Sequence, residues 1–247
     1  GSNPGPDSTN NITISDGHSI TVLGGDVASA NDLTLEADGG SGGGSLILDD
    51  GATLIVKGNL VLENGTGIMF NDDAVLILRG VNGNQAFTNN SGSTLTMTNL
   101  QLNNTDGATM SGSDQFELSN GLSLTNGNLT NNSTFTFLSD ATSTATLSKI
   151  SNGALIDGAG TNIVQRFRGA RDANWGDIGS SGVDTDLEDL NGEVFMCGIV
   201  GGNGNAWNNA GGQGTFVSVY TWNATTDVYV PAANTSEAMT PGVGFEI

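Results

Sequence analysis

A short apolar-x-apolar triplet returns along this chain about every 20 residues, and this repeat constrains the fold more than any other feature. Two further series of triplets follow the first at similar spacing. A fixed period with several such triplets per repeat is typical of a coiled β-solenoid. The triplets of the first series start at Ile12, Leu33, Leu54, Val75, Leu95, Phe116, Phe135 and Leu155.

Because strand side chains alternate between two faces, each triplet directs two side chains inward and one outward. One coil cannot bury its own core, but stacked coils can. We therefore expect an all-β chain, with a right-handed parallel β-helix of about eight coils over residues 12–164. A β-rich C-terminal cap or small domain is expected over residues 165–247. Inward positions are predicted for Leu54, Val56, Leu95, Met97, Phe116, Leu118, Phe135 and Phe137.

The two ends of the chain lead to separate predictions. Residues 1–11 are a lead-in to the first coil, and Gly1-Ser2 is typical of the remnant of a purification tag. Residues 244–247 read as the middle of a strand, so we expect the chain to be part of a larger polypeptide. No apolar run approaches the roughly 18 residues that span a bilayer, so no membrane insertion is expected.

Gly, Asn, Asp, Ser and Thr cluster between the triplets, as tight corners require. Four segments share the form polar-Gly-x-Ser/Thr-apolar, and we expect them on one common corner, with Gly supplying a positive φ. They are residues 16–20, 50–54, 91–95 and 106–110.

Asparagines that recur at the spacing of the coils predict a ladder of stacked amides, with ordinary use of Asn in turns as the alternative. They are Asn64, Asn84, Asn104 and Asn126.

The charge of the chain excludes several partners. Lys plus Arg number 6 and Asp plus Glu 26, for a net charge of -20. Nucleic acid and anionic membrane surfaces would be repelled.

The bulge at 39–44 lacks the Lys and the following helix of a phosphate-binding loop, and we expect it to be flexible. Cys197 is the only cysteine and His18 the only histidine, so we expect a buried thiol and a solvated turn residue.

Paired aspartates give the sharpest candidate site. Asp50 and Asp72 are 22 residues apart, which predicts that the pairs Asp49-Asp50 and Asp72-Asp73 lie on adjacent coils at one corner. Four neighbouring carboxylates repel one another unless a cation intervenes, and Ca²⁺ prefers oxygen ligands. The hypothesis is therefore a calcium site, and the alternative is a solvated acidic corner. A second calcium hypothesis concerns the alternating oxygen ligands Asp184, Asp186 and Glu188.

Catalysis on a polysaccharide is the main enzymatic alternative. A lyase requires a basic residue beside the metal, and Lys57 and Arg79 are spaced to stack. They lie 6 to 7 residues from the paired aspartates, roughly 20 Å along extended chain. A glycoside hydrolase requires paired carboxylates in a groove, and sugar-binding grooves carry stacking aromatics, yet residues 12–164 contain no Trp or Tyr. We therefore expect no enzymatic activity.

Large aromatic residues gather after residue 164. Residues 216–222 and 228–230 read as a hairpin joined by 223–227. Exposed aromatics there could stack on sugars, and packing in a core is the alternative. The candidates are Trp175, Trp207, Trp222 and Tyr229.

An ice-binding array is less well supported, because Ile55, Leu76 and Glu117 interrupt the threonines of the first triplet series. Those threonines are Thr13, Thr34, Thr96 and Thr136.

Several segments together resemble the extracellular repeat regions of large secreted and surface proteins of the Bacteroidetes type, which are adhesin-like. The segments are 11–17, the Gly-x-Ser/Thr-Leu coils, 126–135, 164–167, 220–223, 229–231 and 240–245. The resemblance implies display, spacing or adhesion at the cell exterior, and it brings no catalytic residues. We expect a non-catalytic extracellular stalk or ligand-displaying module, with a glycan or another cell-surface ligand as partner. A polysaccharide-binding or polysaccharide-cleaving β-helix is the alternative.

Overall fold

The computed structural model describes residues 9–37, 39–40, 42–80, 83–165, 177–179, 186–190, 196–202, 217–223, 225–238 and 244–246. The chain divides into two compact units, Gly1–Gly169 and Ala170–Ile247. The only helix of the described residues is a 3-10 turn, η1 (Leu187–Leu190). No described helix has the length and apolar character that crossing a membrane requires. The all-β prediction is confirmed.

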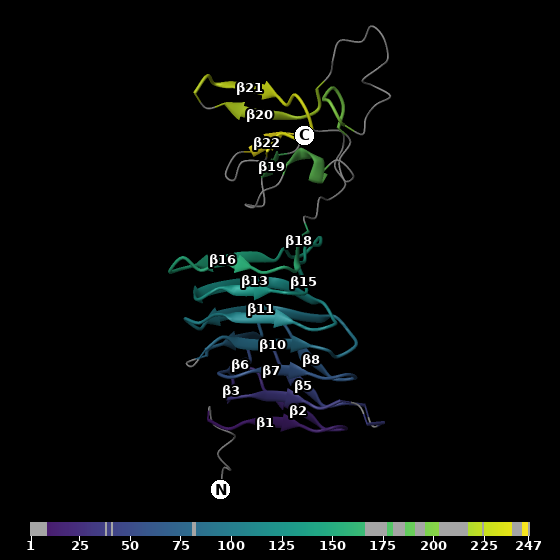
Figure 1. Ribbon diagram of the computed structural model, residues 1–247, viewed down its shortest axis with the longest axis vertical. Helices are drawn as coiled ribbons and strands as arrows, with labels where there is room; N and C mark the ends of the chain where they lie inside the picture. Colours follow the sequence, from purple (N-terminus) through teal and green to yellow (C-terminus); the bar gives the residue numbers. More distant parts are fainter. Residues whose placement is uncertain are drawn as a thin grey trace. The chain divides into compact units, whose positions relative to one another are not determined.

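The first unit is a stack of parallel strands that form three sheets (Figure 1). Sheet A contains β1 (Ile12–Ile14), β4 (Leu33–Leu35), β7 (Leu60–Leu62), β10 (Gln85–Asn89), β12 (Ala108–Ser111), β14 (Leu129–Asn131) and β17 (Ile156–Asp157). Sheet B contains β2 (Ser19–Val22), β5 (Ser45–Leu48) and β8 (Gly67–Phe70). Sheet C contains β3 (Val27–Ala30), β6 (Thr53–Val56), β9 (Val75–Leu78), β11 (Leu95–Asn103), β13 (Phe116–Asn126), β15 (Thr134–Phe137), β16 (Thr146–Ile150) and β18 (Thr161–Val164).

These strands form about six turns of a parallel β-solenoid, so the predicted fold is confirmed and the predicted count of about eight coils is too high. The error comes from counting triplets of different sheets as one series. Leu33 of sheet A pairs with Leu60, whereas Leu54, the next triplet start, belongs to sheet C and pairs with Leu76. One turn of chain is therefore often longer than the distance between triplets.

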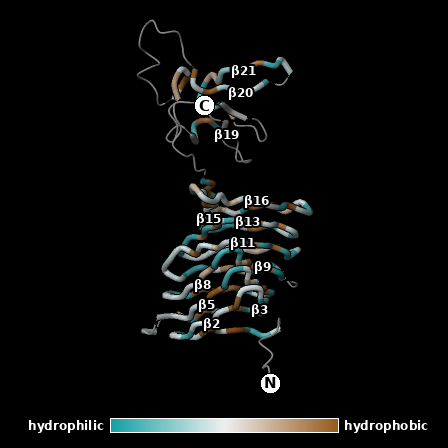
Figure 2. The backbone as a smooth tube through the Cα atoms, turned by 180° about the vertical axis from the view of Figure 1, so that it is seen from behind, coloured by the Kyte–Doolittle hydropathy of each residue, from teal (hydrophilic) through white to brown (hydrophobic). Residues whose placement is uncertain are grey.

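The core lies between the sheets and consists of the residues predicted to point inward. All eight of those residues are buried. The rings of Phe87 and Phe116 meet edge to face across the core, with centroids 4.9 Å apart. Hydrophilic and hydrophobic residues alternate along the coils (Figure 2), as a solenoid with one filled interior requires. Burial of these apolar side chains is the main favourable term in the stability of such a stack.

The four Gly-containing corners do not share one corner, contrary to the prediction. Gly17 precedes β2 of sheet B, Gly51 and Gly92 precede β6 and β11 of sheet C, and Gly107 precedes β12 of sheet A. All four have φ between 72° and 83°, so the predicted backbone conformation is correct. Every corner of the coil needs the same sharp bend. The motif therefore predicts a bend, but it does not predict which of the corners the bend occupies.

The predicted amide ladder is wrong in its membership. Asn104 is buried and its amide donates to the backbone oxygens of Gly83 and Gly107. Asn126 does belong to a ladder, but with other partners: its Nδ2 donates to Asn103 Oδ1, and Asn152 Nδ2 donates to Asn126 Oδ1, both at 2.6 Å.

A second ladder precedes the strands of sheet A. Asn11 Oδ1 accepts the N–H of Asp32 at 3.3 Å, and Asp32 Oδ1 accepts the N–H of Asn59 at 2.7 Å. Asn59 Oδ1 then accepts the N–H of Ala86 at 2.9 Å. Each side chain thus satisfies the backbone of the next coil, which ties the coils together at their polar corner.

Sheet B ends at β8 because the corner between sheets B and C flattens. In the fourth and fifth coils one long strand replaces two short strands and the corner between them. β11 contacts β8 and pairs with β9, and β13 pairs with both β15 and β16. The first three coils therefore have three sides, whereas the next two have a longer continuous side.

The second unit contains an antiparallel sheet of order β19-β22-β20-β21. Its strands are β19 (Asp177–Gly179), β20 (Tyr220–Asn223), β21 (Val228–Pro231) and β22 (Gly244–Glu246). The predicted hairpin is present as β20 and β21, although its first strand begins at Tyr220. The Cys197 thiol is buried and His18 is exposed, as predicted.

Truncation of a central core residue tests the packing of the solenoid. Phe116→Ala is expected to lower the free energy of unfolding by about 3–5 kcal/mol, because it leaves a cavity around a side chain with no exposed surface. Leu23→Ala is the control, since Leu23 is 61% exposed and its loss should cost about 0.5 kcal/mol or less. Urea denaturation followed by circular dichroism measures both. Equal losses in the two variants would contradict the described core.

Candidate functional site

The paired aspartates lie on a corner where three turns stack between sheets B and C. The turns are 23–26, 49–52 and 71–74, one in each of the first three coils. Each is closed by a backbone hydrogen bond from its fourth residue to its first, with N···O distances of 3.0, 2.8 and 3.1 Å. The structure thus brings Asp50 and Asp72 to equivalent positions of adjacent coils, where the Gly51 N–H donates to the Asp72 backbone oxygen at 3.1 Å.

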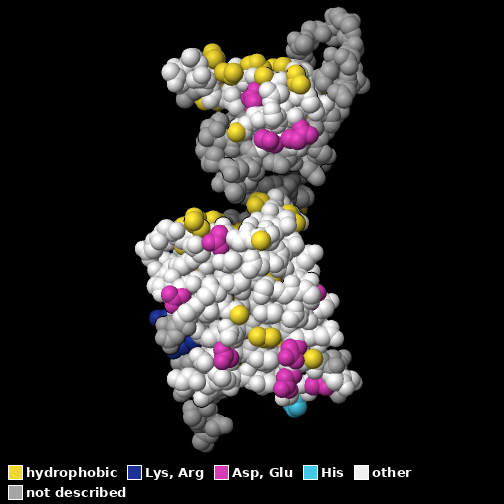
Figure 3. Space-filling model, in the orientation of Figure 1, with side chains coloured by type: hydrophobic (Ala, Val, Ile, Leu, Met, Phe, Trp, Pro, Cys, Tyr) yellow, Lys and Arg dark blue, Asp and Glu magenta, His cyan; other side chains and the backbone are white. Residues whose placement is uncertain are grey.

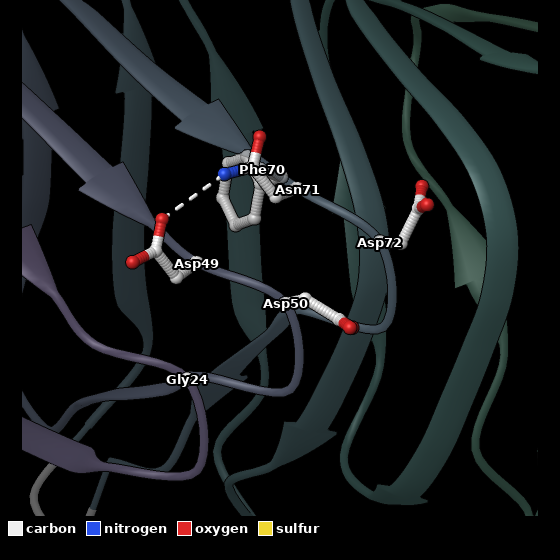
Figure 4. Close-up of a pocket in the computed structure, with 6 residues that line it drawn as sticks. All are labelled: Gly24, Asp49, Asp50, Phe70, Asn71 and Asp72. Carbon is white, nitrogen blue, oxygen red and sulfur yellow. Dashed lines mark hydrogen bonds between the residues drawn. The ribbon is translucent and has the colours of Figure 1, made fainter.

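The three carboxylates that line this corner, those of Asp49, Asp50 and Asp72, do not converge. Asp49 Oδ1 accepts a hydrogen bond from Asn71 Nδ2 at 3.2 Å, and Asp50 and Asp72 point away from Asp49 (Figure 4). The shallow depression here is lined by Gly24, Asp49, Asp50, Phe70, Asn71 and Asp72. No group of three or more His, Cys, Asp or Glu side chains among the described residues is arranged to hold a metal ion. The geometry therefore favours the alternative of a solvated acidic corner.

The third residue of each stacked turn has a left-handed backbone. Gly25, Gly51 and Asp73 have φ values of 80°, 72° and 56°. Glycine adopts this conformation without steric cost, and aspartate is among the few other residues that tolerate it. The turn therefore accounts for the backbone conformation of Asp73, which does not line the depression.

The glycine-rich bulge at 39–44 is held by a carboxylate of the first coil. Asp16 Oδ2 accepts the N–H of Gly39 and Asp16 Oδ1 accepts the N–H of Gly43, both at 3.1 Å. A Cβ on Gly44 would lie 2.2 Å from the Ile14 backbone oxygen, so the chain needs glycine for this close approach. The two N–H groups are four residues apart in the chain, and the Asp16 carboxylate holds both ends of the bulge to the first coil.

The basic pair considered for a lyase lies at a different corner from the aspartates. Lys57 and Arg79 follow β6 and β9, and their N–H groups donate to Ala30 O and Val56 O, so they do occupy equivalent positions. Asp50 precedes β6 and Lys57 follows it. The structure therefore separates the acidic and basic candidates by the length of a strand.

A second depression beside Lys57 is a structural corner. Its lining residues are Asn31, Asp32, Lys57, Gly58, Asn59, Gly83, Asn84 and Gln85. Asp32 and Asn59 belong to the ladder that precedes sheet A, and Gln85 Nε2 donates to Gly58 O at 2.6 Å. These polar groups hold neighbouring coils together, which accounts for their presence without a ligand.

The threonines considered for ice binding do not form one array. Thr13 and Thr34 are adjacent in sheet A, where Val61 follows them. Thr96 lies in sheet C, where it pairs with Glu117, and Thr136 is buried. Thr13 and Thr34 therefore lie on sheet A, whereas Thr96 and Thr136 lie in one column of sheet C with Glu117 between them.

In the second unit, Asp184, Trp175 and Trp207 lie outside the described residues. Asp186 Oδ1 accepts the Glu188 N–H at 3.0 Å, so this carboxylate lies at the first turn of η1, and Glu188 is exposed. A carboxylate at that position stabilises a helix start without any metal.

Trp222 and Tyr229 form an exposed aromatic pair on the hairpin. They are directly opposite in β20 and β21, with ring centroids 5.0 Å apart and planes at 65°. Trp222 is 44% and Tyr229 54% exposed, so the alternative of core packing is wrong for these two residues. The periodicity of a short edge hairpin does not reveal which face is covered, so sequence reasoning left this open.

Comparison with known families, with curated proteins and with solved structures finds no match to this chain. The candidate sites therefore rest on their own geometry.

The backbone of the stacked turns gives one prediction. Gly51→Ala is expected to lower the free energy of unfolding by about 1–2 kcal/mol, because an L-residue at φ 72° is strained. Nothing lies closer than 3.9 Å to the added Cβ, so the effect comes from the backbone alone. Gly67→Ala is the control, since the space there is open. Thermal and urea unfolding measure both, and an unchanged Gly51→Ala variant would contradict the turn.

The divergence of the carboxylates gives a second prediction. Melting temperatures in millimolar Ca²⁺ and in Mg²⁺ of equal concentration are expected to agree, because no preformed set of ligands selects the larger ion. Differential scanning fluorimetry after EGTA treatment measures the shift. An ion bound only to the native state must raise the melting temperature. A calcium-specific rise that is lost in Asp72→Asn but kept in Ser93→Asn would restore the calcium hypothesis.

Proposed function

We propose that this chain is a non-catalytic structural or adhesion module of an extracellular or cell-surface protein. The observation that carries the proposal is that the polar side chains of the solenoid form hydrogen bonds within the chain. Among the described residues every buried side-chain nitrogen and oxygen has a hydrogen-bond partner. At the corners of the solenoid, exposed and half-buried side chains also bond to the neighbouring coil, as in the two side-chain ladders. The polar side chains of the described solenoid therefore contribute to holding successive coils together.

The surface charge supports an exterior location. Acidic side chains are spread over the face drawn in Figure 3, whereas Lys and Arg gather at one edge of the solenoid. A net charge of -20 keeps an extended repeat protein soluble and limits unspecific association. The resemblance of the segments to adhesin-like repeat regions agrees with this location.

A glycan turnover assay tests the absence of catalysis. We expect no release of reducing or unsaturated ends from acidic or neutral polysaccharides, with or without Ca²⁺. The paired aspartates and the basic pair Lys57 and Arg79 lie at different corners, and general acid–base catalysis requires hydrogen-bond reach. Reproducible turnover that is lost in Lys57→Ala or Arg79→Ala, but kept in Lys149→Ala, would overturn the proposal.

Glycan binding is a second candidate function, and the exposed Trp222–Tyr229 pair favours it. Exposed aromatic rings provide faces on which apolar sugar faces can stack. A neutral glycan suits the site, since the acidic chain repels acidic polymers. Polar atoms flank the pair, because Thr221, Asn223 and Thr225 lie in or beside the same hairpin.

Affinity electrophoresis in gels that contain neutral polysaccharides tests this candidate. A polysaccharide that retards the protein is expected to lose this effect in Trp222→Ala, and to retard Val228→Ala as it does the original chain. Val228 is similarly exposed, at 49%, but it has no ring. Retardation that survives the loss of both Trp222 and Tyr229 would contradict the aromatic site.

A further inference from the structure

The residues of the β20–β21 hairpin that carry rings all lie on one of its two faces. Trp222 is directly opposite Tyr229. Tyr220, two residues before Trp222, is directly opposite Pro231. Opposite residues of an antiparallel pair share a face, and every second residue of a strand returns to it. These four residues therefore form one surface, the ring face. The other face is formed by Thr221, Asn223, Val228 and Val230.

The two exposed aromatic rings of the ring face are inclined to each other. The planes of Trp222 and Tyr229 make an angle of 65°, with the centroids 5.0 Å apart. In such an edge-to-face arrangement the edge of one ring meets the face of the other. A flat surface can stack on two ring faces at once only when those faces are parallel and level. A crystalline polysaccharide, whose chains form a flat surface, therefore finds only one ring face here.

A single polysaccharide chain is not restricted in this way. It rotates about each glycosidic bond, so successive sugar rings can turn to follow two inclined aromatic rings. The right-handed twist of a two-stranded ribbon adds to this requirement, because it rotates the Tyr220–Pro231 pair relative to the Trp222–Tyr229 pair. The ring face thus matches the geometry of a chain that turns along its length.

The turn of the hairpin holds the two strands in register before any ligand binds. The Asp227 N–H donates to the Asn223 backbone oxygen at 2.9 Å. Asn223 Oδ1 accepts the N–H groups of Thr225 and Thr226 at 2.9 and 3.2 Å. A site that is fixed in advance loses less conformational entropy on binding.

The same turn presents polar groups beside the rings. Thr225 and Thr226 are exposed, and within the described part of the chain their hydroxyls take part in no hydrogen bond. A hydroxyl both donates and accepts, as the hydroxyls of a sugar do. Residues 172–247 contain no Lys, Arg or His, so this part of the chain offers no cation to an anionic glycan. The charge therefore favours an uncharged ligand.

We propose that the ring face binds a single dispersed chain of a neutral polysaccharide and rejects the crystalline form of the same polymer. This preference rests on glycan binding, the second candidate function, and it specifies the physical form of the glycan. The inclination of Trp222 to Tyr229 selects the dispersed chain, and the absence of cations selects a neutral one.

Co-sedimentation of the full chain with cellulose, chitin and starch tests the proposal. Each polymer is supplied in a swollen, disordered form and as crystalline particles, and binding is expressed per accessible surface area. At least one swollen polymer is expected to bind about tenfold more tightly than its crystalline form. Trp222→Ala and Tyr229→Ala should each weaken that binding about tenfold, because each removes one of the two rings.

Val228→Ala is the matched control. Val228 lies on the opposite face and is 49% exposed, against 44% for Trp222, so its loss should leave binding unchanged. Trp222→Phe retains a ring and should keep the preference for the swollen form. Equal or tighter Trp222-dependent binding to the crystalline form would contradict the proposal and leave glycan binding in place. The absence of binding to every polymer in both forms would exclude the two together. Circular dichroism confirms that each variant is folded.

Discussion

The parallel backbone ladder between successive coils is the interaction on which the rest of this structure depends. Each strand of a coil must offer its N–H and C=O groups in register to the next coil, because buried backbone groups without partners are costly. The register also determines which side chains stack in a column. The core columns, the corner turns and the side-chain ladders all follow from it. A side chain at a corner is useful to the fold when its oxygen can reach the next coil, as Asp32 and Asn59 do.

The sequence predicted the fold class and the inward residues because both depend on local alternation. The spacing of triplets repeats strongly enough to identify a solenoid, and the two-residue period identifies its core. The number of coils depends on which triplets share a sheet, and triplets of different sheets look alike. Leu33 and Leu54 illustrate this, since they belong to the same spacing series but to different sheets. The ladder of Asn11, Asp32 and Asn59 was missed because its spacing changes from coil to coil.

The candidate site was predictable in position but not in geometry. A separation of 22 residues correctly placed Asp50 and Asp72 at one corner. The direction of each side chain depends on its place within the turn, and Asp49 turns to Asn71 for that reason. The exposure of Trp222 and Tyr229 likewise depends on what covers a short hairpin, which no local pattern encodes. The hypotheses that concern Trp175, Trp207 and Asp184 lie outside the described residues.

The change from three-sided coils to coils with one long side has an evolutionary consequence. Repeat proteins grow and shrink when a whole repeat is copied or lost. A copy of the segment that carries β7, β8 and β9 would match its neighbours among the first coils, and a copy of β12 and β13 would match those of the later block. The described solenoid holds two junctions between the types of coil, where the long strands β11 and β13 stack against pairs of short strands. A coil copied within its own block would need no further junction, because its strands match those of its neighbours.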